Sequence, residues 1–375
     1  MFYILLTYLI SPVLYLLIFF RRRNETKKIL VIQTAKIGDL ICSTPVFREI
    51  KKKYPNVHLT VMVNPVTKEL LEYNPYIDEI LSITPHECKG LLGKIRLSKL
   101  IFKGKYDVGI SLNPNIPFAT ALFWGLVPVR VSVMPNFLGI SFKLASKFFN
   151  YLEPHISGQM VIETYLKMLK IIGIESRNTT KEIYSSKDCN IKVEQILGQI
   201  DKPLIGIAVS SGNKLKELGV DKIVKIINQL LKIFDVYIVL IGSAEEKLIS
   251  EKVISFAEKK DRIINALGLL SLKELPALIK KLSLFIGVDT GITYMADTLN
   301  IPLINIAGPA NMKDQRPTGE KVIIIQKNLP CIPCSHAFKS PYYCKINSRE
   351  CIESVFAEEI ISAAKKLFSN LVKNL

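Results

Sequence analysis

The residues best suited to chemistry in this sequence lie in short loops that follow apolar, strand-like segments. The first such loop, residues 33–40, contains Lys36, Gly38 and Asp39. Gly38 allows a tight turn at this point. Two roles are open for Asp39: it caps the next helix, or it acts as a general base that takes a proton from an attacking hydroxyl group. The positive end of the helix would keep such a carboxylate ionised.

A second loop, residues 209–216, combines small hydroxyl side chains with lysine. Ser210 and Ser211 precede Gly212, and Lys216 ends the loop. Hydroxyl groups and backbone amides donate hydrogen bonds to phosphate oxygens, and lysine adds a positive charge, so the loop is suited to binding a diphosphate. It has neither the Walker pattern nor the three-glycine dinucleotide fingerprint. A solvated polar loop is the simpler alternative.

A third loop ends another strand-like segment with Asp289, Thr290 and Gly291. Backbone amides at the start of the following helix would stabilise a departing phosphate, and Asp289 would accept hydrogen bonds from sugar hydroxyls. An ordinary helix cap is again the alternative. Glu246, beside Glu245 after a neighbouring strand, would bind a ribose diol, although acidic residues are common in the first turn of any helix.

Four of the seven cysteines lie close together late in the sequence, at Cys331, Cys334, Cys344 and Cys351, with His336 between them. The first pair has the two-residue spacing of zinc ligands, but six residues separate the second pair, which is a loose fit. We therefore favour free thiols or a labile disulfide over a zinc site. The segment follows the last predicted strand, so we expect a structural role in either case.

Short apolar segments alternate with helical patterns in two series, which predicts an α/β protein with two doubly wound, Rossmann-like domains and a cleft between them. The predicted strands are residues 28–33, 57–63, 79–83, 106–112 and 129–133, then 203–209, 235–241, 262–265, 283–288 and 301–307. Ligands of such sheets bind beyond the carboxyl ends of the strands, where the three loops lie.

The expected divisions of the chain are residues 1–26 for an anchor, 27–175 for a first Rossmann-like domain, 176–352 for a second Rossmann-like domain and 353–375 for a C-terminal helix that crosses back over the first domain. The polar stretch 175–201 is interpreted as the connection between the domains.

The first 20 residues carry no charge, and a cationic cluster of Arg21, Arg22, Arg23, Lys27 and Lys28 follows them. About 20 apolar residues are enough to cross a bilayer, and cations after such a segment predict a cytoplasmic body. A cleaved signal peptide fits less well, because it would carry positive charge before the apolar stretch. We expect a hydrophobic anchor helix that either spans the membrane or lies within one leaflet.

The formal net charge of +17 suits an anionic partner such as an acidic membrane or a phosphorylated small molecule. Nucleic acid is the weakest candidate, because the sequence has no zinc-finger spacing, RNA-binding aromatic signature or long basic tail.

Together, these loops resemble glycosyltransferase family nine, the lipopolysaccharide heptosyltransferases. The resemblance covers about residues 28–355 and rests on the order of Gly38-Asp39, Ser43-Thr44-Pro45, the serine-rich loop with Lys216, Asp289-Thr290-Gly291, Gly308-Pro309 and Cys331-Ile332-Pro333-Cys334. It implies a GT-B fold and an inverting transfer without a metal or cofactor. The implied donor is a nucleotide-sugar, typically ADP-heptose.

The resemblance also implies that residues 27–175 form the acceptor-side domain and residues 176–352 the donor-binding domain, and it implies roles for individual residues. Asp39 looks like the family's general base, and Lys36 and Gly38 lie on the acceptor side of the same loop. The implied donor-binding residues are Ser210, Ser211 and Lys216 for the pyrophosphate, Glu246 for the ribose, and Asp289, Thr290 and Gly291 for the sugar and phosphate.

Three positions depart from the family pattern. Tyr294 replaces a usual histidine, Leu218 a common tryptophan, and Ala310 the threonine of a frequent Gly-Pro-Thr. All three lie on the donor side, so a sugar other than heptose is an open alternative.

We therefore expect a glycosyltransferase that moves a sugar, with ADP-heptose favoured as donor, onto lipopolysaccharide core or a related glycolipid at the cytoplasmic face of the inner membrane. Two alternatives are a sugar-nucleotide epimerase of the same fold and a non-catalytic, membrane-anchored protein that binds sugar nucleotides. Retention of Asp39 argues against the second, because binding alone needs no base.

Overall fold

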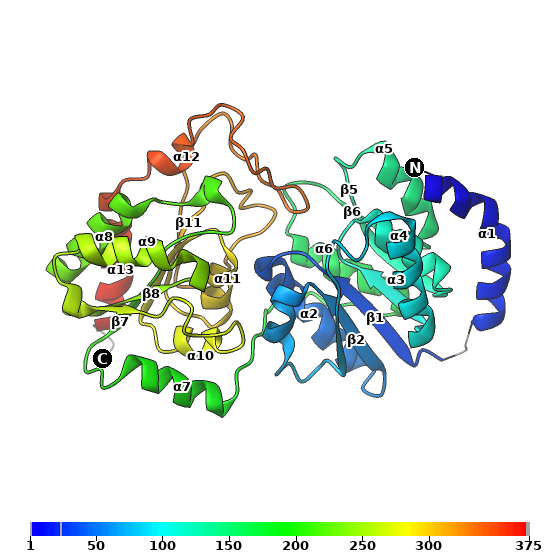
Figure 1. Cartoon of the computed structure of the whole chain (residues 1–375), viewed down its shortest axis with the longest axis horizontal. Coiled ribbons are helices and arrows are strands. Elements are labelled where there is room, and N and C mark those ends of the chain that lie inside the picture. Colours follow the sequence, from blue (N-terminus) through cyan, green and yellow to red (C-terminus); the bar gives the residue numbers. More distant parts are fainter. Residues whose placement is uncertain (1, 23–24, 373–375) are drawn as a thin grey trace. The chain divides into compact units, whose positions relative to one another are not determined.

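The computed structural model describes residues 2–22 and 25–372, so Arg23 of the predicted cationic cluster lies outside the described residues. The chain divides into two compact units, with the division between Lys181 and Glu182. The sequence suggested a division between residues 175 and 176. Each unit has its own parallel sheet, its own helices and its own apolar core (Figure 1).

The first unit contains a six-stranded parallel sheet in the order β3-β2-β1-β4-β5-β6. Its strands are β1 (Lys28–Gln33), β2 (His58–Val63), β3 (Glu79–Ser82), β4 (Val108–Ser111), β5 (Val129–Pro135) and β6 (Tyr151–His155). Its helices are α1 (Phe2–Arg21), α2 (Ile37–Lys53), α3 (Gly90–Gly104), α4 (Ile116–Trp124), α5 (Ile140–Ala145) and α6 (Val161–Met168), with 3-10 turns η1 (Pro65–Leu71), η2 (Ser146–Phe148) and η3 (Leu169–Ile172).

The second unit repeats this plan in the order β12-β11-β10-β7-β8-β9. Its strands are β7 (Leu204–Ala208), β8 (Tyr237–Ile241), β9 (Ile263–Asn265), β10 (Leu284–Val288), β11 (Leu303–Ile306) and β12 (Val322–Ile325). Its helices are α7 (Lys187–Leu197), α8 (Val220–Ile233), α9 (Lys247–Phe256), α10 (Leu275–Ile279), α11 (Gly291–Thr298), α12 (Glu350–Glu353) and α13 (Ala357–Val372), with 3-10 turns η4 (Lys214–Lys216), η5 (Ala244–Glu246) and η6 (Lys260–Arg262).

Both sheets are doubly wound, as the alternating sequence pattern predicted. The strand order reverses between β1 and β4 in the first unit and between β7 and β10 in the second. These reversals are topological switch points, where the carboxyl ends of neighbouring strands leave room for a ligand. Ligand-binding residues are therefore expected in the loops after β1, β4, β7 and β10.

The strands β6 and β12 and the helix α7 were not expected from the sequence. The edge strand β6 contains Pro154, which has no N–H to donate and is tolerated only at such an edge. The edge strand β12 has only four residues. The predicted connection contains α7, which begins at the cap Ser186 and ends at Gly198 with φ of 68°. Local capping thus produces a helix in a stretch without a strong apolar pattern.

The C-terminal helix α13 packs on the second unit, whereas the sequence suggested a path across the first domain. Ile360, Ala364 and Phe368 lie in the apolar core formed with α8 and the second sheet. The Phe368 ring is 4.8 Å from that of Phe234, measured between centroids. Burial of this apolar face explains the position of α13.

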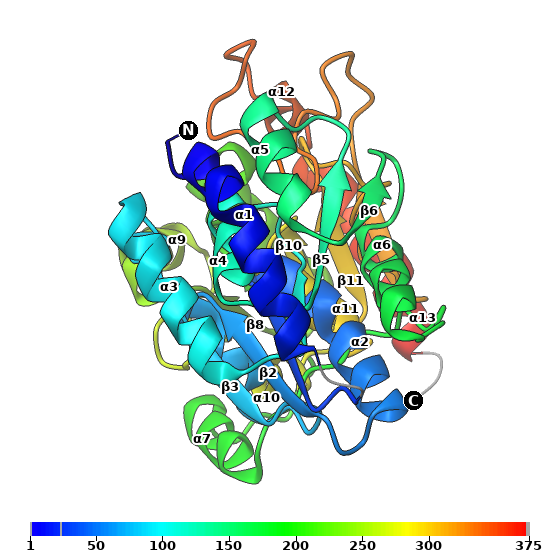
Figure 2. The same ribbon diagram turned by 90° about the vertical axis from the view of Figure 1, so that its right-hand side faces the viewer.

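The expected N-terminal apolar helix is present as α1. Residues Tyr3–Arg21 have a mean hydropathy of 2.2, so α1 is long and apolar enough to cross a membrane by length and composition alone. Figure 2 shows α1 lying along α3 and α4 of the first unit. Ile4 and Ile18 join the core of that unit.

Candidate functional site

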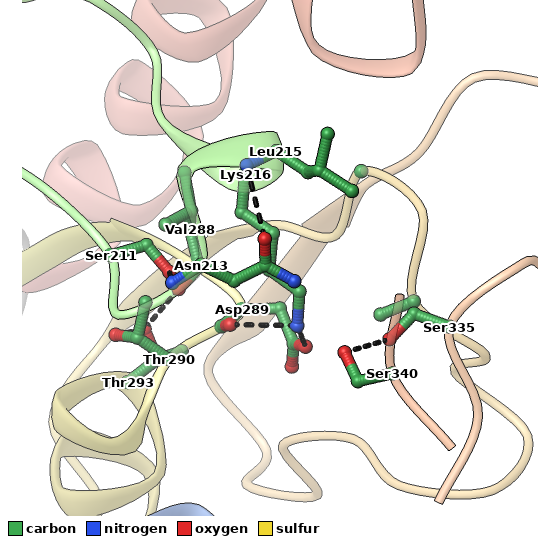
Figure 3. Close-up of polar contacts among 12 residues, drawn as sticks. Ser211, Asn213, Leu215, Lys216, Val288, Asp289, Thr290, Thr293, Ser335 and Ser340 are labelled. Atoms are coloured by element: carbon green, nitrogen blue, oxygen red, sulfur yellow. Dashed lines mark hydrogen bonds and ion pairs between the residues drawn. The ribbon is translucent and has the colours of Figure 1, made fainter. Parts of the chain in front are cut away.

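The loops after β7 and β10 come together at the switch point of the second sheet. Lys216, in η4, places its Nζ 2.5 Å from Oδ2 of Asp289 and 3.2 Å from the main-chain oxygen of the same residue (Figure 3). Asp289 directly follows β10, which pairs with β7. Two sequence-predicted residues that are far apart in the chain are therefore in direct contact.

This ion pair is buried and has a third member. The side chains of Lys216 and Asp289 are 11% and 10% exposed. Tyr294 of α11, itself buried, donates its hydroxyl to Oδ1 of Asp289 at 2.9 Å. Asp289 thus uses one carboxylate oxygen for each neighbour and fixes the position of the lysine. An ammonium has three N–H donors, so one remains for a phosphate oxygen beyond the two contacts to Asp289.

Thr290 and Gly291 lie at the start of α11. Thr290 occupies the cap position with an extended backbone, φ of −137°, and its side chain makes no cap hydrogen bond. The simple capping role considered for this loop is therefore absent. A helix start that its own cap residue leaves unbonded is suited to binding an anion through its first-turn amides.

Ser210 and Glu246 form a second contact at the same edge of the sheet. The Ser210 hydroxyl donates to Oε1 of Glu246. Oε2 of Glu246 accepts a hydrogen bond from the backbone N–H of Ser243 at 2.8 Å, which closes the turn η5 after β8. The neighbouring Glu245 is exposed. The structure therefore brings Glu246, the residue first chosen from the sequence, towards the serine loop.

Asn213 belongs to this site although the sequence did not single it out. Its backbone N–H donates to Oγ of Ser211 at 3.2 Å, and its side-chain oxygen accepts from the N–H of Leu215 at 3.1 Å (Figure 3). Its amide also donates to the main-chain oxygen of Pro341 at 2.9 Å. Asn213 is 4% exposed. These contacts set the shape of the loop that carries Ser211 and Lys216.

In the first unit, Asp39 lies in the first turn of α2, directly after β1. Its Oδ2 accepts a hydrogen bond from the backbone N–H of Lys36 at 3.1 Å, so the capping contact considered from the sequence is present. Lys36 is exposed, Gly38 is buried and Asp39 is partly exposed. A carboxylate has about four lone-pair sites on two oxygens, so capping and proton transfer are compatible roles.

A buried tyrosine lies near Asp39. Nε2 of Gln33 is 3.4 Å from both the main-chain oxygen of Asp39 and the hydroxyl of Tyr165 on α6. Burial raises the pKa of Tyr165 well above its ordinary value, and the negative charge of Asp39 raises it further. Tyr165 therefore stays protonated. The sequence did not predict this neighbour, because Tyr165 belongs to a helix far along the chain.

The four late cysteines lie in the second unit as free thiols. Burial raises the pKa of the Cys351 thiol, and the nearby Cys334, Cys331 and Cys344 raise it further. Within the described residues, no group of three or more His, Cys, Asp or Glu side chains could hold a metal ion.

Backbone contacts join this cysteine segment to the loop after β11. The N–H groups of Cys334 and Ser335 donate to the main-chain oxygen of Pro309 at 3.1 and 3.0 Å.

Comparison with known proteins gives the family. The model of glycosyltransferase family 9 (heptosyltransferase) matches residues 94–342, more than half of the chain. The chain belongs to glycosyltransferase family 9. This membership confirms the resemblance drawn from the motifs and identifies the protein as a glycosyltransferase. Neither alternative, an epimerase or a non-catalytic binding protein, is favoured.

Individual heptosyltransferases and a family 9 structure match nearly the whole chain. Lipopolysaccharide heptosyltransferase 3 of Escherichia coli K12 is 26% identical over 339 residues, which cover 88% of this chain and 95% of that protein. A family 9 structure from Veillonella parvula has a TM-score of 0.76 at 20% identity and covers 93% of this chain and 99% of that chain. The E. coli ADP-heptose lipopolysaccharide heptosyltransferase II has a TM-score of 0.72 at 17% identity, with 92% and 99% covered. These structures confirm the GT-B-like fold.

Proposed function

We propose that this family 9 glycosyltransferase transfers heptose from ADP-heptose to the core of lipopolysaccharide. The observation that carries the proposal is the buried cluster of Lys216, Asp289 and Tyr294 at the switch point of the second sheet. A fixed ammonium beside an uncapped helix start suits the diphosphate of a nucleotide-sugar. The relatives named for heptosyl transfer, and for ADP-heptose in one case, support the choice of donor and acceptor.

In the proposed reaction, Asp39 takes the proton from a hydroxyl of the acceptor sugar. The resulting oxygen nucleophile forms a bond to the anomeric carbon of heptose while the bond from that carbon to the diphosphate breaks. ADP leaves with the electron pair, and attack from the opposite face inverts the anomeric centre. Lys216 and the first-turn amides of α11 stabilise the charge that develops on ADP, so we propose that transfer needs no metal ion.

The remaining predicted residues have binding roles in this proposal. Ser210 and Ser211 donate hydrogen bonds to the pyrophosphate, Thr290 and Gly291 shape the helix start, and Glu246 accepts from the ribose hydroxyls. Asp289 contacts the donor sugar while it holds Lys216. Lys36 and Gly38 border the acceptor beside Asp39.

We propose that the enzyme works at the cytoplasmic face of the inner membrane and is held there by α1. The apolar composition of α1, with Arg21 and Arg22 at its end, supports this location. A lipid-linked acceptor would be reached at the same surface.

Thermal unfolding with nucleotide-sugars tests the donor assignment. Ligand that binds only the native state raises the melting temperature, so we expect the largest increase with ADP-heptose among ADP-, GDP-, UDP- and CDP-sugars. Transfer to purified lipopolysaccharide should continue in excess EDTA. A larger increase with a sugar of another base would contradict the proposed donor, and loss of transfer in EDTA would contradict metal independence.

A further inference from the structure

Polar contacts fasten α1 to the first unit along its inner face. Thr7 is fully buried, and its Oγ1 accepts a hydrogen bond from Nε1 of Trp124 on α4 at 3.0 Å. The hydroxyl of Tyr8 donates to the main-chain oxygen of Leu144 on α5 at 2.7 Å. These bonds lie in the first half of α1 and supplement the burial of Ile4.

The two ends of α1 are held by cations. The ammonium of Lys94 on α3 lies 4.1 Å from the centre of the Tyr3 ring. At the other end, the Arg21 guanidinium donates to the main-chain oxygens of Gly125 and Phe102, each at 3.0 Å, and lies 4.8 Å from the centre of the Phe102 ring. A helix that crosses a bilayer must leave the body of the protein, which would break these contacts.

The outer face of α1 is apolar and exposed. It consists of Leu5, Leu9, Val13, Leu16 and Phe20, which are 57–79% exposed. Their spacing of three or four residues places them on one stripe of the helix, opposite Ile4, Thr7 and Ile18. In solution, water would surround this stripe. Burial of the stripe in lipid removes the free-energy cost of exposing these apolar side chains to water.

Cations lie next to this stripe. α3 packs beside α1 and exposes Leu92, Arg96, Lys99 and Lys103 at the spacing of a single helical face. α1, α3 and α5 contain no Asp or Glu. Figure 2 shows these three helices side by side on the first unit. Apolar side chains beside basic ones, without acidic ones, complement the surface of an anionic membrane.

We propose that α1 does not span the bilayer but lies in the plane of one leaflet, docked on the first unit, with the apolar stripe of α1 in the lipid and the basic face of α3 against anionic headgroups. This inference deepens the proposed membrane location and rests on it. Such helices enter the boundary between headgroups and acyl chains to a depth of about 5–10 Å.

In-plane docking of α1 also brings a cavity of the first unit close to the lipid. A cavity of about 270 Å³ follows β1, β3 and β4 and is lined by Thr34, Thr84, Lys89, Lys94 and Asn115, among others. Lys94 both lines this cavity and covers Tyr3 of α1. In-plane docking of α1 therefore positions the acceptor side of the first unit next to the surface that holds a lipid-linked acceptor.

The topology of α1 separates the two membrane models. An epitope tag with a protease site, placed before α1 on the full chain, would be tested in sealed inside-out vesicles of the inner membrane. In-plane docking predicts cleavage of the tag without detergent, on the same side as the body of the protein. Protection of the tag until detergent is added would show a spanning helix and overturn the proposal.

Vesicle flotation tests the basic face. The triple variant Arg96→Gln, Lys99→Gln, Lys103→Gln should bind vesicles of phosphatidylethanolamine and phosphatidylglycerol about 100-fold more weakly than the wild type, from ~1 kcal/mol per cation. The matched control neutralises three exposed lysines of the second unit, Lys252, Lys260 and Lys366, and should bind normally.

An equal loss of vesicle binding in both triple variants would overturn the assignment of the basic face. If the wild-type chain formed a dimer without lipid and did not float with the vesicles, the surface would instead be assigned to a second copy of the chain. The increase in melting temperature with ADP-heptose should be unchanged in both variants, which separates failure of this inference from failure of the proposed donor.

Discussion

The ammonium of Lys216 and the carboxylate of Asp289 stabilise each other where both side chains are largely buried. Removing one partner of a buried ion pair leaves the other charge without compensation, which is strongly destabilising. Tyr294 supplies one further hydrogen bond to the same carboxylate. In the proposed function, the same cluster contributes both to stability and to donor binding.

Lys216→Gln should lower both the free energy of unfolding and kcat/KM for ADP-heptose. We expect the free energy of unfolding to fall by about 3 kcal/mol, because Asp289 remains buried without its cation. We expect kcat/KM for ADP-heptose to fall by about 100-fold or more, because the developing charge on ADP loses a donor. Urea unfolding and transfer kinetics measure the two effects. Lys214→Gln, at an exposed lysine of the same turn, is the matched control, and an equal loss there would contradict this role of Lys216.

Tyr294→Phe tests the hydrogen bond that stands where the family usually has histidine. The variant keeps the ring in its buried position and removes only the hydroxyl. We expect a loss of about 1.5 kcal/mol in the free energy of unfolding, since the acceptor is a charged carboxylate. Tyr343→Phe, at an exposed tyrosine, should have no effect in the same urea titration. Unchanged stability of Tyr294→Phe would show that this bond contributes nothing.

The residues of this candidate site stand out in the sequence, but their contacts do not. Ser210, Asp289 and Gly291 stand out because glycine, hydroxyl and acidic residues after a strand are suited to ligand binding. The contact of Lys216 with Asp289 and that of Asn213 with Pro341 join loops far apart in the chain. No local pattern encodes such contacts, which depend on the order of the strands in the sheet.

At the scale of elements, α13 depends on a carboxylate at its start. Nζ of Lys327 lies 2.7 and 2.8 Å from the two carboxylate oxygens of Glu359, and the N–H of Phe356 donates to the same group at 2.8 Å. The hydrogen bonds from Lys327 and from Phe356 hold the pKa of Glu359 below its ordinary value. These bonds help fasten α13 to the strand end that carries Lys327.

Glu359→Gln should therefore have a pH-dependent effect. A carboxyl group with a lowered pKa stabilises the fold above its unfolded-state pKa, and this contribution is lost as pH falls through the folded-state pKa. We expect the free energy of unfolding of the variant to be lower than that of the wild type by up to about 1 kcal/mol at neutral pH, and to match the wild type in strong acid. Urea titrations across pH measure the difference, with Glu258→Gln as control. A difference that grew as pH fell would contradict the assignment.

The elements that the sequence predicted are the ones whose pattern is locally strong. β1, β7 and β10 are continuous apolar runs buried on both faces, so they were predictable. β6 and β12 are edge strands whose residues are mostly half exposed. α7 depends on its cap and on contacts such as Lys192 with Glu274, 2.9 Å apart. Neither pairing at a sheet edge nor a contact between distant side chains produces a regular spacing of apolar residues in the sequence.

At the scale of the whole molecule, the two units have the same strand order, and we propose different tasks for them. The proposed base Asp39 follows β1 in the first unit, and the proposed donor-binding cluster follows β7 and β10 in the second. The apolar stripe and the basic face of α1 and α3 belong to the first unit. We propose that the first unit binds the membrane and the acceptor and that the second unit binds the nucleotide-sugar.

The most direct test of the proposed reaction is Asp39→Asn, with heptose transfer and ADP-heptose binding measured on the same preparation. The asparagine side chain can still accept the cap hydrogen bond but cannot take a proton. We expect transfer to fall by about 10²–10⁴-fold while the affinity for ADP-heptose is unchanged. Transfer at the wild-type rate would contradict the role of Asp39 as the base, and loss of donor binding would contradict the division of tasks between the two units.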